Sequence, residues 1–256
     1  MFKQAIVRLP GDNFASGLTR FDLGVPELPQ ALEQHSRYCA ALERCGLAVT
    51  TLPADPRFPD GTFVEDTAIV LREGAMITRP GAVSRLGEVT PIRTALHAHY
   101  PALAQIVAPG TVDGGDICEA RRHVFIGLSE RTNAEGAAQL AQWLAGMGYT
   151  SSTVAIHGMP SILHLKSGMS WIGEKTLLVI DELASHPAFA DYQLVRISAE
   201  ESYAANAIRV NAHVLLASGF PRLHSQLQTL GYSCIALDMS EFEKMDGGLS
   251  CLSLRF

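Results

Sequence analysis

Apolar residues recur at helical spacing in three segments of the chain, and a glycine ends each segment. In residues 28–45, for example, Leu28, Leu32, His35, Cys39 and Leu42 fall on one face. The other two segments are residues 133–147 and 222–230, and the three terminating glycines are Gly46, Gly148 and Gly231. A strand-like apolar run follows each glycine. The pattern therefore predicts a helix, a stop and a strand three times, with a weaker copy over 88–107 and a degenerate one over 185–197.

Short apolar runs occur in pairs between these predicted helices. The pairs lie within residues 67–78, 116–128, 169–180 and 207–218, and a few polar residues or glycines separate the two runs of each pair. Two such runs joined by a short polar turn are typical of a β-hairpin. The predicted unit is therefore a hairpin followed by a helix, a glycine and a third strand.

This unit repeats at a regular interval. The residues just before, or inside, the first strand of each unit are Glu65, Asp113, His164, Asn206 and Cys251, with separations of 48, 51, 42 and 45. Units of this size cannot each bury a core, so we expect them to pack around a common axis. The prediction is an α/β fold of five ββαβ units, the last strand being supplied near the C-terminus. An ordinary α/β domain of unrelated segments is the alternative.

Composition and charge narrow the class of protein. The 256 residues are 47% hydrophobic and carry a net charge of −6, without the basic stripe that nucleic-acid binders show. No apolar run approaches the ~18 residues of a membrane span, and Arg8 and Pro10 interrupt any secretory leader. Five cysteines without a C-x-x-C pair favour a reducing, cytoplasmic compartment.

Residues 58–66, FPDGTFVED, place three carboxylates among apolar residues. Buried carboxylates are costly unless they are paired, and a guanidinium can pair with them through two hydrogen bonds. If Glu65 and Asp66 lie on a strand, they point to opposite faces. The segment therefore indicates a site for a cationic group around Asp60, Glu65 and Asp66. A solvated turn is the alternative.

Three further segments contain reactive side chains at equivalent unit positions. Asp113 is followed by Gly114 and Gly115, His164 lies in an apolar run, and Cys251 follows the glycines of DGGLSC. Taken singly, they suit a hairpin turn, a core histidine and an inert thiol. Together, a cysteine, a histidine and an orienting carboxylate supply the groups for nucleophilic catalysis. The acidic surroundings should keep the Cys251 thiol protonated until a cation arrives.

Six ordered motifs carry a resemblance to a known family. They are FPDGTFVED, TVDGGD, ERTNAEGA, LHLKSGMS, ESYAANAIRVN and DGGLSCLSLRF. From Leu18 to Phe256 the chain resembles the dimethylarginine dimethylaminohydrolases of the guanidino-group-modifying, or pentein, superfamily. The resemblance implies a five-bladed α/β propeller around a central active site, formed by residues 1–256 as one catalytic domain.

The resemblance also implies a role for each matching residue. Cys251 matches the nucleophile and His164 the general acid and base. Asp113 matches the acidic residue that holds the histidine and contacts the guanidinium, at a position where the family has Glu or Asp. Asp60, Glu65 and Asp66 match the carboxylates around the guanidino and amino groups of the substrate, and Arg85 and Arg131 match the arginines that bind its carboxylate. The main chain of Leu18 and of Met245 matches the segments that contact the substrate. The loop around Leu18 would act as a lid.

The activity implied is hydrolysis of N-omega-methylated L-arginine to L-citrulline and a methylamine, through a covalent cysteine intermediate. No cofactor or metal is implied, and the partners would be this small-molecule substrate and a second copy of the chain in a homodimer. An arginine deiminase would use the same residues, but such enzymes usually carry an inserted helical domain that this length leaves no room for. A non-catalytic binding module with the same fold is the more distant alternative.

Overall fold

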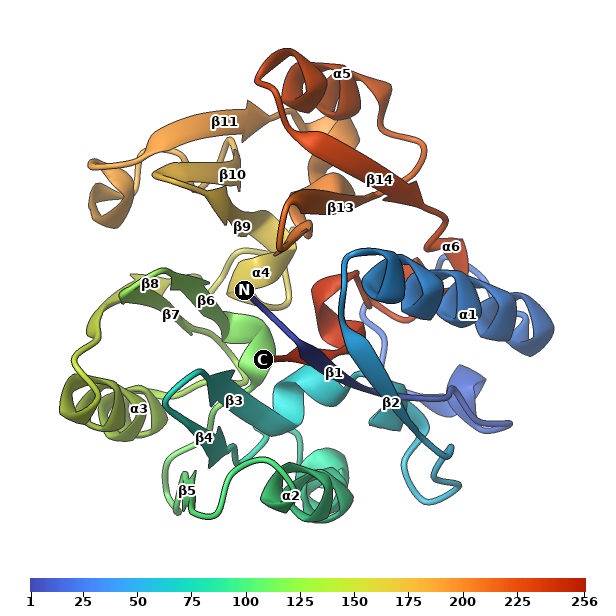
Figure 1. The fold of residues 1–256 in the computed structure, drawn as a ribbon, viewed down its shortest axis with the longest axis vertical. Helices are drawn as coiled ribbons and strands as arrows, with labels where there is room; N and C mark the ends of the chain where they lie inside the picture. Colours follow the sequence, from blue (N-terminus) through green and yellow to red (C-terminus); the bar gives the residue numbers. More distant parts are fainter.

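The computed structural model describes all of residues 1–256 and contains five separate three-stranded sheets arranged around a central axis (Figure 1). The sheets are β1 (Gln4–Arg8) with β2 (Ala48–Leu52) and β15 (Leu254–Arg255); β3 (Ala68–Leu71), β4 (Gly74–Ile77) and β5 (Leu103–Gln105); β6 (Ile117–Ala120), β7 (His123–Leu128) and β8 (Thr150–Ala155); β9 (Met169–Gly173), β10 (Thr176–Ile180) and β11 (Gln193–Ile197); and β12 (Ile208–Val210), β13 (His213–Ala217) and β14 (Ser233–Leu237). The predicted five-unit α/β propeller is confirmed.

Four sheets have the same topology, an antiparallel hairpin whose second strand pairs in parallel with the third. The sheet of β15, β1 and β2 has the same pairing, but its antiparallel strands come from the two ends of the chain. A parallel pair needs a crossover connection, and helices provide it in four units. They are α1 (Leu28–Arg44), α2 (Val89–His97), α3 (Ala134–Gly146) and α5 (Pro221–Thr229). In the fourth unit the crossover contains only a 3-10 turn, Pro187–Phe189, as the degenerate pattern predicted.

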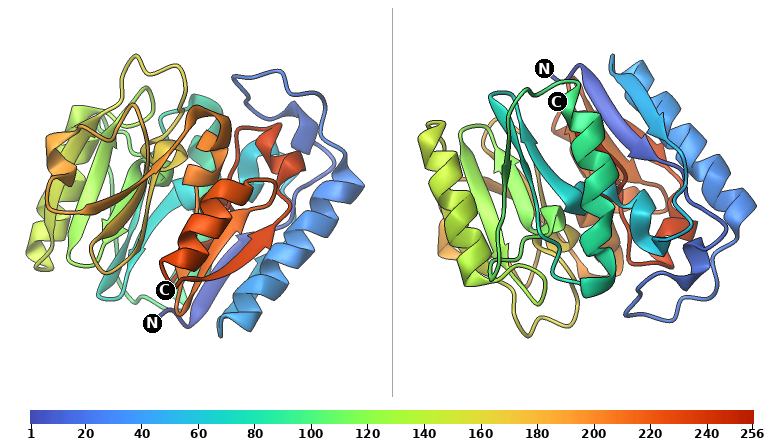
Figure 2. Two further views of the ribbon diagram at one scale, coloured as in Figure 1. Left: turned by 90° about the horizontal axis from the view of Figure 1, so that it is seen from above. Right: turned by 90° about the horizontal axis from the view of Figure 1, so that it is seen from below.

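The two ends of the chain complete one sheet together. β15 pairs antiparallel with β1, with Ala5 opposite Arg255 and Ile6 opposite Leu254. Both termini therefore lie at the centre of the molecule (Figure 1), while α1 lies on its outside in both side views (Figure 2). None of the helices is both long enough and apolar enough to cross a membrane.

The residues that begin each unit are not in strands. They lie in or beside short helical turns that precede the first strand: η3 (Val64–Thr67), η5 (Gly114–Asp116), α4 (Leu165–Gly168), η7 (Ala199–Ala205) and η8 (Ser250–Leu252). Neighbouring turns contact one another around the axis. Glu65 and Asp66 therefore lie just before the strand and not within it, and a tight turn also directs the two side chains apart.

Helix α1 buries most of the predicted face: His35 and Leu42 are buried, and Leu28 and Cys39 are partly buried against the core. The prediction differs from the structure at two positions. Leu32 is 37% exposed, whereas Tyr38 is fully buried and its hydroxyl lies 2.6 Å from the Ser253 hydroxyl. The aromatic ring reaches the centre of the molecule, which a shorter leucine side chain would not do. The buried core is divided into four clusters that lie around the axis, so the axis itself is left to polar residues.

Candidate functional site

A small cavity of about 30 Å³ lies at the end of the axis beside the loop that contains Leu18. Eight of the ten predicted site residues line it: Leu18, Asp60, Asp66, Arg85, Arg131, His164, Met245 and Cys251. They come from segments far apart in the sequence, which the five turns bring together. The other two predicted residues, Asp113 and Glu65, do not line this cavity.

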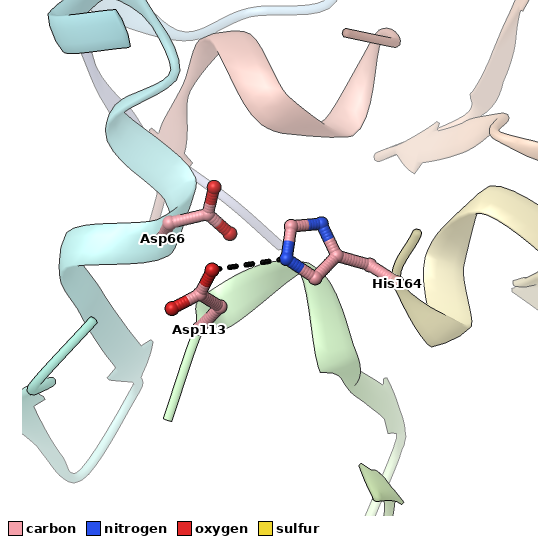
Figure 3. A group of neighbouring side chains, drawn as sticks. All are labelled: Asp66, Asp113 and His164. Atoms are coloured by element: carbon pink, nitrogen blue, oxygen red, sulfur yellow. Dashed lines mark hydrogen bonds and ion pairs between the residues drawn. The ribbon is translucent and has the colours of Figure 1, made fainter. Parts of the chain in front are cut away.

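Asp113 lies directly behind His164. Its Oδ2 is 3.0 Å from His164 Nε2, and its Oδ1 accepts a hydrogen bond from the Gly81 N–H at 2.8 Å (Figure 3). Asp113 has no exposed surface, and His164 is 7% exposed. The carboxylate is thus fixed by the backbone and in turn fixes the imidazole.

The charge on His164 depends on the carboxylates around it. Burial alone would lower the pKa of His164, but Asp66, Asp113 and Asp116 favour the protonated ring and raise the pKa to about 9. Asp66 experiences the reverse effect. Burial opposes its ionisation, but His164 and Arg85 outweigh burial and lower its pKa to about 2. At neutral pH the site therefore contains an imidazolium between carboxylates.

Glycines permit the close approach of these groups. A Cβ added to Gly115 would lie 2.6 Å from His164 Nδ1 and 3.0 Å from Asp66 Oδ1, and the Gly115 N–H donates to Asp66 Oδ1 at 2.8 Å. A Cβ added to Gly248 would lie 2.6 Å from Asn206. A side chain at Gly115 or Gly248 would therefore collide with its neighbours, which agrees with the close backbone approach expected from the sequence.

The two arginines of the cavity differ in how fully they are paired. Arg85 donates to both oxygens of Glu88, to Asp66 Oδ2 at 2.6 Å and to the Phe63 carbonyl at 3.0 Å. No hydrogen bond or ion pair is recorded for the guanidinium of Arg131, which is half-buried. Arg131 is therefore the cation available to an anionic group in the cavity, whereas Arg85 mainly fixes Asp66.

Cys251 lies in the η8 turn, and its Sγ accepts a hydrogen bond of 3.4 Å from the Gly248 N–H. Burial raises the pKa of the thiol to about 12, and Glu65 and Asp66 contribute in the same direction. This direction agrees with the expectation that the acidic surroundings do not ionise the thiol.

Two carboxylates hold the loop that covers the cavity. Asp60 Oδ1 accepts the Leu18 N–H at 2.9 Å, and Asp246 Oδ2 accepts the Arg20 N–H at 2.6 Å. Leu18 is 43% exposed, while Met245 is buried and lines the cavity. The main-chain segments at Leu18 and Met245 therefore flank the cavity.

Glu65 faces the opposite side of the ring of turns. Its carboxylate pairs with Lys166 Nζ at 2.5 Å, accepts the Ser250 hydroxyl at 2.7 Å and lies 3.4 Å from Arg255 Nη2. It is 5% exposed. The sequence prediction grouped Glu65 with Asp66, but adjacent side chains of one turn point to different neighbours, and only Asp66 reaches the cavity.

Sequence reasoning missed several residues that support this site. Asp116 accepts the Leu165 N–H at 2.9 Å and thereby fixes the turn after His164. Asn206 bonds both the Lys166 carbonyl and Ser250. Glu88 pairs with Arg85. The repeat position of Asn206, the second aspartate of TVDGGD and the i,i+3 spacing of Arg85 and Glu88 were visible signals.

Asp66, Asp113 and His164 are the residues that could hold a metal ion, since one ligand atom from each lies within 4.8 Å of the others (Figure 3). Their atoms already have partners, because Asp66 pairs with Arg85 and Asp113 with Gly81 and His164. A metal would have to displace these partners. The arrangement suits a hydrogen-bonded organic cation better.

Comparison with known proteins gives one consistent family. The model of the arginine deiminase family matches residues 55–219. The chain is 45% identical, over the full length of both proteins, to N(G),N(G)-dimethylarginine dimethylaminohydrolase of Pseudomonas aeruginosa. It is 34% identical to the enzyme of that name from Streptomyces coelicolor, over 99% of this chain and 96% of the relative.

Solved structures support the same assignment. The P. aeruginosa enzyme with a cysteine replaced by serine, complexed with citrulline, matches with a TM-score of 0.97 and 45% identity over both full chains. The N-terminal domain of a cyanobacterial arginine dihydrolase is only 17% identical but shares the fold, with a TM-score of 0.88 over 98% of this chain and 96% of that domain. On its full-length identity and its fold, this chain belongs to the dimethylarginine dimethylaminohydrolase family, within the wider family of arginine deiminases.

Proposed function

We propose that this protein hydrolyses N-omega-methylated L-arginine to L-citrulline and a methylamine. The observation that carries the proposal is the 45% full-length identity to a dimethylarginine dimethylaminohydrolase, in a chain whose Cys251, His164 and Asp66 line one cavity. We further propose that residues 1–256 act as one catalytic domain, since the cavity draws on segments from Leu18 to Cys251.

Substrate binding is the first step. The guanidinium lies beside Asp66, whose depressed pKa keeps it ionised, and the substrate carboxylate pairs with Arg131. Asp60 and the main chain at Leu18 and Met245 are placed to contact the amino-acid end of the substrate. Asp113 orients His164 and does not contact the guanidinium. Glu65 lies on the opposite side of the ring of turns, where it pairs with Lys166.

The arriving cation offsets the negative field around Cys251, so the thiol releases its proton to water as the complex forms. Cys251 Sγ then forms a bond to the central guanidino carbon. The bond from that carbon to the methylated nitrogen breaks, and the leaving amine takes a proton from the His164 imidazolium. The product of this half-reaction is a covalent thiouronium on Cys251.

Water completes the reaction. The imidazole of His164, now neutral, takes one proton from water while the oxygen adds to the thiouronium carbon. The proton of the added hydroxyl group passes to the Cys251 sulfur as the carbon–sulfur bond breaks and the ureido carbonyl of citrulline forms, so Cys251 leaves as the thiol with His164 protonated again. Asp113 and Asp116 favour the imidazolium in this step because they raise the histidine pKa.

Arginine deimination is the second candidate, because the family model that matches residues 55–219 is that of arginine deiminase. The length of this chain does not exclude a deiminase-type activity, since an arginine dihydrolase domain matches over 96% of its own length. Identity decides between them, at 45% for the dimethylaminohydrolase against 17% for the dihydrolase. The side chains of Phe63, Leu163 and Met245 also give the cavity apolar surface that suits a methylated nitrogen.

The test is a citrulline assay with arginine, monomethylarginine and asymmetric dimethylarginine in parallel, with the released amine identified. We expect dimethylamine and citrulline in equal amounts, and no turnover by Cys251→Ser. Ammonia from arginine as the main activity would support the deiminase instead. If no guanidino compound reacts and a chloroacetamidine does not label Cys251, a binding module becomes the better description.

Two further properties are proposed. All five cysteines are free, which favours a reducing compartment and hence the cytoplasm. A homodimer rests on the family alone. Sedimentation equilibrium of the purified protein would measure the subunit number directly.

A further inference from the structure

The larger cavity of this protein does not lie at the candidate active site. It has a volume of about 930 Å³, and Glu65, Lys166, Ser250 and Arg255 are among its lining residues. None of its lining residues is shared with the small cavity around Cys251. Cavities of roughly 300–1,000 Å³ are the size that proteins use for small organic ligands.

The floor of this cavity is the rear side of the ring of turns. Glu65 is the chain neighbour of Asp66, Gly114 of Asp113 and Ser250 of Cys251, and all three floor residues line the large cavity. Lys166 lies two residues after His164. A single layer of turns therefore separates the two cavities.

The walls combine positive charge with apolar surface. Six cationic side chains line the cavity, namely those of Lys3, Arg72, Arg121, Lys166, Arg209 and Arg255, against two side-chain carboxylates, those of Glu65 and Glu119. The amino group of Met1 and the carboxylate of Phe256 add one charge of each sign. At the floor, Lys166 and Arg255 share the single buried carboxylate of Glu65. Burial raises the pKa of Glu119 to about 7, which weakens its contribution to neutralising them. Cations in excess of carboxylates at a buried position favour an anionic ligand.

A second observation is that two wall cations have no carboxylate partner. Arg72 makes no side-chain hydrogen bond or ion pair, and Arg209 donates only to the carbonyls of Asn211 and Ile172. Cations without a carboxylate partner at the wall of a cavity are available to an anionic ligand. Trp171, Ile117 and Ile208 add apolar surface nearby.

We propose that this rear cavity is a second ligand site, and that it binds an organic monocarboxylate with an apolar body. The carboxylate lies against Lys166, and the apolar body lies against the Trp171 and Ile208 walls. One excess positive charge at the buried floor matches a monoanion. The proposal does not depend on the proposed function, since none of these residues lines the small cavity.

The test is calorimetric titration of the full-length protein, with any tag removed because Met1 and Phe256 line the cavity. The probe is 3-phenylpropanoate, and 3-phenylpropanamide is its neutral counterpart. We expect the carboxylate to bind at least tenfold more tightly than the amide. We expect Arg131→Ala, which removes the unpaired cation of the small cavity, to bind the probe within twofold of wild type.

Two variants at Val70, a half-buried wall residue, distinguish the effect of an added negative charge on probe binding from the effect of a larger side chain. Val70→Glu should weaken probe binding at least tenfold, and Val70→Gln by less than threefold. If Val70→Glu does not fold, Arg209→Gln provides the same test, with an expected loss of at least threefold. Equal binding of acid and amide, loss of binding in Arg131→Ala, or no binding at all would overturn the proposal.

Discussion

At the scale of single residues, His164 is the group whose chemistry depends most on its neighbours. Its folded pKa of about 9 lies above the usual 6.5, so the folded protein retains a proton that the unfolded chain releases. The resulting stability is fully present below pH 6.5 and is lost as the pH rises through about 9. The protonated ring is also the form that the proposed leaving-group step needs.

Asp113→Asn tests this relation with little change of shape. We expect the His164 pKa to fall in the variant, because the carboxylate that bonds Nε2 becomes a neutral amide. The difference in unfolding free energy between wild type and variant should shrink between pH 6 and pH 10. NMR titration of the His164 ring and urea unfolding at each pH measure both effects. A His164 pKa near 6.5 in both proteins would contradict the assignment of the raised pKa to the Asp113 carboxylate.

The Cys251 thiol is predicted to be protonated in the free enzyme, because burial and the nearby carboxylates raise its pKa to about 12. Its alkylation rate should therefore keep rising with pH well above pH 9, where an ordinary thiol has already titrated. A saturating cationic amidine that does not alkylate the thiol should move the midpoint to lower pH. Measurement of the rate with a small neutral alkylating agent tests this. An unliganded midpoint below pH 7 would refute it.

Substitution of Arg131 and of Arg85 by alanine should change different kinetic constants. The unpaired guanidinium of Arg131 is the group available to the substrate carboxylate, and a charged hydrogen bond contributes about 1.5–3 kcal/mol. Arg131→Ala should therefore raise KM by roughly 10- to 100-fold, and much less for a substrate analogue that lacks the carboxylate. Arg85→Ala removes a partner of Asp66, so it should lower kcat with both substrates. Equal losses for both substrates in Arg131→Ala would exclude the carboxylate contact.

At the scale of elements, the short turns before each hairpin determine where the reactive side chains point. Gly115 in η5 allows His164 and Asp66 to approach the backbone, since an added Cβ would lie 2.6 Å from His164 Nδ1. Gly115→Ala should therefore lower kcat by about 10²-fold through displacement of the ring and cost roughly 1–3 kcal/mol of stability.

Gly146→Ala is the matched control for this substitution. Gly146 ends α3 on the surface with no atom within 4 Å of an added Cβ. Alanine there should leave kcat unchanged and add about 0.5–1 kcal/mol of stability, because it restricts the unfolded chain. Steady-state kinetics and urea unfolding of both variants make the comparison. A Gly115→Ala enzyme with wild-type kcat would show that the ring tolerates displacement.

The sequence predicted the repeating elements well, because hairpins and glycine-stopped helices depend on local patterns. It failed at the turns, since a three-residue helical turn leaves no periodicity. That failure affected Glu65 directly. Side-chain spacing could not distinguish a carboxylate that reaches the small cavity from one that pairs with Lys166 on the other side. The unpaired state of Arg131 likewise depends on tertiary contacts that no local pattern records, whereas the Arg85–Glu88 pair is a local i,i+3 pair within one helical turn.

At the scale of the whole molecule, the chain ends complete the ring. The Phe256 carbonyl accepts the N–H groups of Lys3 and Gln4 at 2.7 and 2.8 Å, and the Phe256 N–H donates to the Gln4 carbonyl. Leu254 is 4% exposed, so β15 contributes to the core as well as to the sheet. Cys251 lies only three residues before β15, which links the position of the thiol to closure of the fifth unit.

Deletion of Leu254–Phe256 should therefore damage both stability and the site. Loss of the buried leucine alone costs about 1.5–3 kcal/mol, and the backbone bonds to β1 are lost with it. We expect amide hydrogens of β1 to exchange faster and Cys251 to lose selective labelling by a chloroacetamidine. Hydrogen exchange measured by mass spectrometry and labelling kinetics record the two effects separately. A truncated protein with protected β1 amides would show that β15 is dispensable.

A circular permutant tests whether the fold depends on closure of the ring of five units or on the natural positions of the chain ends. Residues 3 and 256 are hydrogen-bonded to each other, so a short glycine–serine linker can join the natural ends. The chain is then opened between Gly219 and Phe220, where Gly219 is exposed and makes no backbone hydrogen bond. Because every sheet keeps its three strands, we expect activity within tenfold of wild type and Cys251 labelling at the wild-type rate, in contrast to the truncated protein. An unfolded permutant would mean that the order of the units along the chain, and not only their closure around the axis, determines the fold.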